Sequence, residues 1–103
     1  MFVSAHHGSS YAEFRRALDS GNLRLIRVAA AELPQVQLHD ALAILPLLAE
    51  KEPALYERAA CRWLARFALE RQVGLEEIGT ALAALERLPE HPPARWVLAD
   101  LLA

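Results

Sequence analysis

The stretch "YERAACRWLARFALER", residues 56–71, decides how the rest of this sequence is interpreted. At about 100° per residue, its large apolar side chains fall within one arc of roughly 100°, which predicts a helix with one buried face. The members of this arc are Tyr56, Ala60, Trp63, Leu64 and Phe67. Three arginines fall together on a different side of the helix, and we expect them to face water: Arg58, Arg62 and Arg66.

Two features of this helix also allow a functional interpretation. The arginine stripe suits contact with an acidic partner or a phosphate group, although Arg66 is also spaced to pair with Glu70. Cys61, the only cysteine, lies one turn after Arg58, and a nearby cation favours a reactive thiolate. No histidine lies close in the sequence to act as a base. We therefore expect Cys61 to be a small packing residue at the edge of the apolar arc, with a thiol-based sensor as an alternative.

The composition is that of a globular protein. The chain has 103 residues, of which 54% are hydrophobic and 23% are charged, which suits one domain with a single core. Its net charge of −2 gives no strong attraction to nucleic acid or to an anionic membrane. The longest apolar run, residues 41–49, is less than half of the roughly 20 residues that a membrane-spanning helix needs. With no signal peptide and no possible internal disulfide, we expect a soluble cytoplasmic protein.

Glycine, proline and capping residues divide the chain into six predicted helices. Ser10 and Glu13 have the spacing of a capping box at the start of the first helix. Gly21 is a natural helix stop and Asn22 a natural cap for the next helix, while Pro53 suits a first turn. No segment alternates with the period of a strand. The predicted helices cover residues 10–20, 23–33, 38–51, 53–72, 75–88 and 93–103.

A faint internal repeat suggests how these helices are arranged. Residues 36–48 align with residues 73–85 at an offset of 37, which is typical of helical-hairpin repeats; chance similarity in a chain rich in Leu and Ala is the alternative. We expect an all-α domain over residues 10–103, with about six helices as stacked antiparallel hairpins in a short α-solenoid or an orthogonal bundle. Residues 1–9 show no helical period, and we expect them to be a flexible segment.

No pattern typical of an enzyme or of a cofactor site is present. The sequence contains no Gly-rich phosphate loop, no Gly-x-Ser-x-Gly elbow and no His-Glu-x-x-His zinc motif. His6 and His7 are adjacent, but no second pair has the spacing of a zinc site. Glu76 and Glu77 fall in a first helical turn, where the helix dipole favours carboxylates. We expect a non-catalytic protein that holds no metal and no cofactor.

The apolar run "ALAILPLLA", residues 41–49, leaves the third helix without a polar side. Pro46 lies inside it and removes one helical hydrogen bond. A helix that is apolar all round is either wrapped by neighbouring helices or covered by another chain, and both alternatives stay open. The last helix adds a second apolar end, "VLADLLA". The residues expected to contact a partner or a second copy are Leu42, Leu45, Leu47, Leu48, Leu101 and Leu102.

A nucleic-acid-binding alternative depends on residues 26–45, which have the outline of a helix-turn-helix. The second helix of that motif places polar side chains on base edges. No Arg, Lys, Asn or Gln occurs between Leu38 and Leu48, which disfavours base recognition. The alternative is therefore a nucleic-acid-binding or transcriptional accessory factor with a degenerate form of the motif.

Four short pieces of the sequence form a further pattern: Gly21 to Leu23, Ala30 to Pro34, Leu38 to Leu42 and Arg58 to Leu64. With these pieces the chain resembles a group of short all-helical proteins of unassigned function from high-GC bacteria. The resemblance covers about half of the chain. It implies a helical fold and a bacterial source, and it transfers no catalytic or binding residue.

These observations predict a small non-catalytic scaffold or adaptor that binds another protein or a second copy of itself. The expected interface is the apolar run together with the end of the last helix. The arginine stripe, Arg58, Arg62 and Arg66, is the expected contact for an acidic partner. The accessory factor and the thiol-based sensor are the alternatives.

Overall fold

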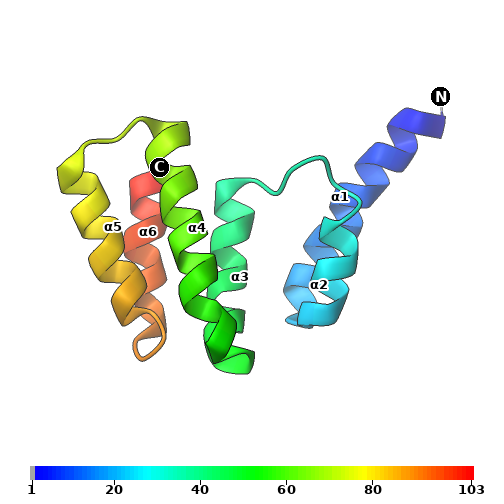
Figure 1. The fold of residues 1–103 in the computed structure, drawn as a ribbon. Coiled ribbons are helices and arrows are strands. Elements are labelled where there is room, and N and C mark those ends of the chain that lie inside the picture. Colours follow the sequence, from blue (N-terminus) through cyan, green and yellow to red (C-terminus); the bar gives the residue numbers. More distant parts are fainter. Residues whose placement is uncertain (1) are drawn as a thin grey trace. The chain divides into compact units, whose positions relative to one another are not determined.

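The computed structural model describes the backbone of residues 2–103 and the side chains from Ser10 onward. Over these residues the chain forms six α-helices, one short 3₁₀ helix and no strand, which confirms the all-α prediction (Figure 1). None of the described helices is long and apolar enough to cross a membrane. The elements are α1 (Phe2–Ser20), α2 (Leu23–Ala30), α3 (Leu38–Lys51), α4 (Pro53–Arg71), α5 (Leu75–Arg87), η1 (Pro92–Ala94) and α6 (Arg95–Leu102).

The helices pack as two units, residues 1–37 and residues 38–103. Because the contacts divide the chain after Gln37, the single domain predicted over residues 10–103 stays a prediction. The flexibility predicted for residues 1–9 also stays a prediction.

The first unit is the hairpin of α1 and α2. Gly21 joins the two helices in the left-handed region, at a φ of 70°, which costs a glycine little. The Asn22 side chain then caps α2, because its Oδ1 atom accepts hydrogen bonds from the backbone N–H groups of Arg24 and Leu25 at 3.0 and 3.2 Å. The predicted stop at Gly21 and cap at Asn22 are confirmed.

The outer ends of this hairpin differ from the prediction. Helix α1 begins at Phe2, so Ser10 is a buried residue within the helix and does not cap its start. Helix α2 ends at Ala30 and does not reach Leu33, because the following N–H groups bond to carbonyls three residues back, as in a 3₁₀ turn.

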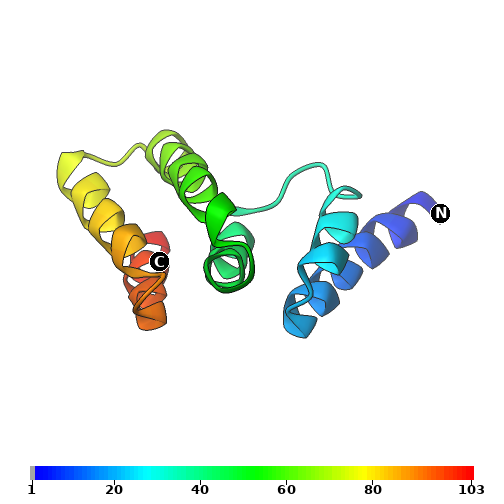
Figure 2. The same ribbon diagram turned by 60° about the horizontal axis from the view of Figure 1, so that its bottom comes forward.

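The second unit consists of two antiparallel hairpins that pack on each other. Only Glu52 separates α3 from α4, and Pro53 occupies the first turn of α4 as predicted. Helix α5 returns through η1 into α6. Because α4 also packs against α5, and α3 against α6, the four helices close into a ring. Figures 1 and 2 show α3 beside α4 and α5 beside α6.

Aromatic side chains of α4 form the centre of this unit. Trp63 and Phe67 are 2% and 0% exposed, and their stacked ring centroids lie 5.4 Å apart, which confirms their predicted inward orientation. Burial of each ring contributes roughly 1.5–3 kcal/mol. The Nε1–H of Trp63 donates a hydrogen bond to the Leu38 carbonyl at 3.0 Å, so α4 is tied to the first turn of α3.

Tyr56 ties α4 to α5 by a comparable bond. Its hydroxyl donates a hydrogen bond to the Leu85 carbonyl at 2.7 Å, and burial raises the pKa of Tyr56 from 10.0 to about 12. In a continuing helix, the Leu85 carbonyl would accept from the residue four positions on, but that residue is Pro89, which has no N–H. Tyr56 therefore supplies a donor that the local sequence does not provide.

The positions at which α3 and α5 begin follow the predicted repeat. Their first residues, Leu38 and Leu75, are paired by the offset of 37. The environments of the two residues differ, because Leu38 is 4% exposed and Leu75 is 87% exposed. The repeat therefore stays a prediction.

Candidate functional site

Two of the three arginines of the stripe on α4 face water as predicted, and the third is partly covered. Arg58 and Arg62 are exposed, while Arg66 keeps 30% of its side chain exposed. The Arg66 Nε–H donates to the Glu70 Oε2 atom at 2.8 Å, which confirms the expected pair one turn apart. Because the Glu70 side chain is 39% exposed, the pair contributes only about 0.3–0.5 kcal/mol.

A groove lies between α3 and α4 beside these arginines. It encloses about 200 Å³, and we call it the α3–α4 groove. Arg58 does not line it, although Arg58 is only one turn before Arg62. The groove is apolar apart from two arginines, and its walls include Ala41, Ile44, Ala59, Arg62, Trp63 and Arg66.

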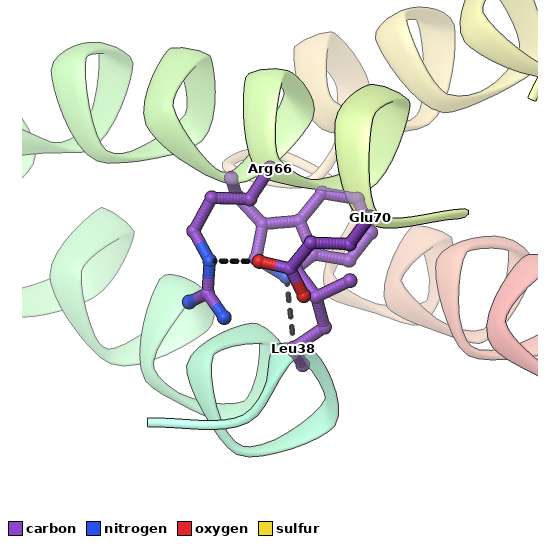
Figure 3. A network of polar contacts seen from close by, with 4 residues as sticks. Leu38, Arg66 and Glu70 are labelled. Atoms are coloured by element: carbon purple, nitrogen blue, oxygen red, sulfur yellow. Dashed lines mark hydrogen bonds and ion pairs between the residues drawn. The ribbon is translucent and has the colours of Figure 1, made fainter. Parts of the chain in front are cut away.

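Arg66 is one of the two polar side chains that line the α3–α4 groove. Figure 3 shows its guanidinium beside the Glu70 carboxylate, with the end of the side chain directed from α4 toward α3. One terminal nitrogen, Nη2, is buried and has no hydrogen-bond acceptor among the described residues. Leaving a buried donor without an acceptor costs about 1–3 kcal/mol. A carboxylate from outside the chain would meet the exposed part of the Arg66 side chain and the neighbouring, exposed Arg62.

A second groove lies where α4 packs against α5. It encloses about 480 Å³, and we call it the α4–α5 groove. Leu82 is 46% exposed in its wall, and one exposed carboxylate comes from each helix, Glu57 from α4 and Glu86 from α5. The groove is therefore apolar with acidic groups at its edges. Its walls include Glu57, Cys61, Leu64, Leu82, Glu86 and Pro89.

Cys61 is exposed in the wall of the α4–α5 groove, so the prediction that it is a packing residue is wrong. The physical reason is its place at the edge of the apolar arc, where Tyr56 and Ala60 are buried but Cys61 is open to the groove. The charged residues that line this groove with Cys61 are glutamates. A thiol-based sensor requires cations beside Cys61, and no described arginine lines the α4–α5 groove.

The predicted apolar interface is mostly buried, although Leu45 and Leu48 line the α3–α4 groove, and its role in binding stays a prediction. Four of its six residues are buried in the core of the second unit: Leu42, Leu45, Leu48 and Leu102. They are buried because α3 packs against both α4 and α6, which cover one side of the apolar run. The other two, Leu47 and Leu101, are half-buried. The backbone at the end of α6, which was expected to have no polar cap, has a polar partner, since the Arg71 Nη1–H donates to the Leu102 carbonyl at 2.9 Å.

Sequence reasoning missed an exposed apolar residue on α6. Trp96 is 58% exposed, and the Arg95 guanidinium lies 4.6 Å from its ring centroid. A signal was available, because Leu98 and Leu102 define the buried side of this helix and Trp96 lies about 200° away from Leu98 at 100° per residue.

A third groove lies within the first unit, between α1 and α2. It encloses about 330 Å³ and is lined by charged residues of both signs as well as apolar ones. Leu25 and Val28, one turn apart on α2, are 50% and 65% exposed. Helix α2 therefore has an open apolar edge in addition to its buried residues, Leu23 and Ile26.

Metal-binding geometry does not occur in the described part of the chain, where no three His, Cys, Asp or Glu side chains are arranged to hold an ion. His6 and His7 lie outside the described side chains. Of the first-turn carboxylates on α5, Glu77 has a structural contact, because its Oε1 atom accepts a hydrogen bond from the Gly74 N–H at 3.2 Å.

The helix-turn-helix outline over residues 26–45 spans the division between the two units. That motif joins its helices through a turn of about three or four residues. Here residues 31–37 separate α2 from α3. The connection is longer than the motif allows, and nucleic-acid binding stays a prediction.

Comparisons with protein-family models, curated proteins and solved structures found no match to this chain. The resemblance to short helical proteins of high-GC bacteria therefore stays a prediction.

Proposed function

We propose that this protein is a non-catalytic helical adaptor that acts in the cytoplasm and binds another protein through the α3–α4 groove. The bound element is an amphipathic helix that places apolar side chains in the groove and a carboxylate against the arginines. The observation that carries the proposal is an apolar groove lined by two arginines, Arg62, which is exposed, and Arg66, which keeps 30% of its side chain exposed.

The dimensions of the groove suit two turns of a helix. From Ala41 to Leu48, the α3 wall extends about 10 Å at the helical rise of 1.5 Å per residue. Helices that dock in such grooves use anchors at positions i, i+3 or i+4, and i+7. Ala41 and Ala59 are small, so a third backbone can approach the walls closely.

The groove has a polar end and an apolar end. The bond from Trp63 to the Leu38 carbonyl places the middle of α4 beside the start of α3. Arg66, one turn later on α4, therefore lies at that end, while Ala59 lies one turn before Trp63 and away from it. We infer that the carboxylate of the partner helix binds at the Arg66 end, where the N-terminal dipole of α3 adds attraction.

Selection of displayed helical peptides on the full chain tests this proposal. We expect the selected peptides to carry apolar residues at i, i+3 or i+4, and i+7, with an Asp or Glu at one end. Arg66→Gln removes a charged hydrogen bond worth about 1.5–3 kcal/mol, so binding of a selected peptide weakens by about 10- to 150-fold. The matched control is Arg58→Gln, the same change on α4 outside the groove. Equal binding to both variants, or no selected peptide at all, would contradict the proposal.

A further inference from the structure

We infer that the α4–α5 groove is a self-association surface that binds helix α2 of a second copy of this chain. This inference goes beyond the proposed function and does not depend on it, because it uses a different groove. In a symmetric pair, each copy supplies one α2 and one groove.

The α4–α5 groove leaves apolar surface open to water. Leu82 is 46% exposed and Leu64 is half-buried, while Tyr56 and Leu85 close the floor through their hydrogen bond. The groove is the largest of the three described above, at about 480 Å³. An occupant with apolar side chains on one edge would remove these groups from water.

Helix α2 has the matching edge. Leu25 and Val28 are 50% and 65% exposed and lie one turn apart on the same side of the helix. Two further residues of α2, Arg24 and Arg27, are exposed, and the helix from Leu23 to Ala30 contains no acidic residue. An apolar edge with arginines next to it is the complement of an apolar groove edged by Glu57 and Glu86.

The net charges of the two units also favour this pairing, because they are opposite in sign. Residues 1–37 contain four Arg and three Asp or Glu, which gives a net charge of +1 with neutral histidines. Residues 38–103 contain seven Lys or Arg and ten Asp or Glu, which gives −3. Opposite charges on two surfaces speed their encounter and favour this pairing over alternatives that bring like charges together. Association between the first unit of one copy and the second unit of another is therefore favoured.

The only cysteine gives a direct readout, because Cys61 lies in the wall of the α4–α5 groove. The test measures the mass of the full chain by light scattering, and the alkylation rate of Cys61 by a maleimide, from low micromolar to several hundred micromolar chain. We expect the mass to rise above that of the 11.4 kDa monomer. The alkylation rate is expected to fall in proportion to the remaining monomer, since docked α2 covers the thiol.

Exchanging the charges of the two surfaces tests whether α2 contacts the α4–α5 groove of a second copy. Glu57→Lys with Glu86→Lys makes the groove basic, and Arg24→Glu with Arg27→Glu makes α2 acidic, so each variant alone repels its own copies. We expect self-association of each to weaken by at least about tenfold. An equimolar mixture restores both contacts, because each copy then meets a groove of opposite charge, and this recovery also shows that both variants are folded. Glu76→Lys with Glu90→Lys is the matched control, since these exposed residues do not line the groove.

Three results would overturn the inference: a constant monomer mass, association that leaves Cys61 alkylation unchanged, or a mixture that does not recover. Association without protection of Cys61 would place the contact on another surface. None of these results bears on the α3–α4 groove, whose test uses peptides and Arg66.

Discussion

The substitution Tyr56→Phe removes one hydroxyl from the centre of the second unit and isolates the Leu85 carbonyl. The hydroxyl donates to this carbonyl at 2.7 Å, and Pro89 offers no N–H in its place. Tyr56 is 8% exposed, so water has little access to the acceptor that remains. A buried polar group without a partner costs about 1–3 kcal/mol, and we expect the free energy of unfolding to fall by that amount.

Thermal and urea unfolding of the full chain measure this loss. For a domain of about 60–100 residues, each kcal/mol lowers the Tm by about 4–8 °C. The control is Tyr11→Phe, the same chemical change at a side chain that is 44% exposed, for which we expect a change within about 0.5 kcal/mol. A Tyr56→Phe variant as stable as the parent would refute the reasoning that the hydroxyl replaces the missing N–H.

The pH dependence gives an independent check on the same residue. Burial raises the pKa of Tyr56 from 10.0 to about 12, so as the pH rises the unfolded tyrosine ionises before the folded one. The stability that comes from protonated Tyr56 is complete below pH 10.0 and is lost as the pH rises through about 12. The difference in unfolding free energy between the parent and Tyr56→Phe should therefore narrow over this interval. A difference that stays constant would show that Tyr56 is not buried as described.

Three further substitutions test local features by thermal unfolding. Asn22→Ala removes the cap of α2 and should cost about 1 kcal/mol, whereas Asn22→Asp keeps an acceptor and should be nearly neutral; equal losses would argue against capping. Arg71→Met keeps an unbranched stem but removes the guanidinium and its bond to the Leu102 carbonyl, with an expected cost of about 0.5–1.5 kcal/mol, and an unchanged Tm would contradict a role for that bond. Leu75→Ser changes a side chain that is 87% exposed, so we expect a shift within about 0.5 kcal/mol, and a larger loss would mean that Leu75 is covered.

Helix content and the inward side of α4 could be predicted because they depend on local chemistry. Gly21 and Asn22 set a boundary through backbone conformation and a side-chain acceptor, which act within four residues. Trp63 and Phe67 recur at helical spacing, so one wheel is enough to place them together. For such residues, neighbours in the sequence decide the structure.

The grooves could not be predicted, because they depend on which helices pack together. Cys61 and Ala60 are adjacent in the sequence, yet one is exposed and the other is 7% exposed, and the difference depends on how α4 packs against its neighbouring helices. Likewise, the apolar run of α3 does not reveal that α4 and α6 cover Leu42 and Leu45. The bond from Tyr56 to Leu85 joins residues 29 positions apart, a separation that no local pattern encodes.

The contact between Arg71 and the Leu102 carbonyl also guides the design of labelled proteins. It fixes the last turn of α6 beside the last turn of α4. Glu57, at the edge of the α4–α5 groove, lies about 20 Å from Arg71 along the axis of α4. A fluorophore or affinity handle joined after Ala103 therefore starts about 20 Å from the Glu57 end of that groove but only about 10 Å from its Leu64 end, so the Glu57 end is the better place for a distance readout.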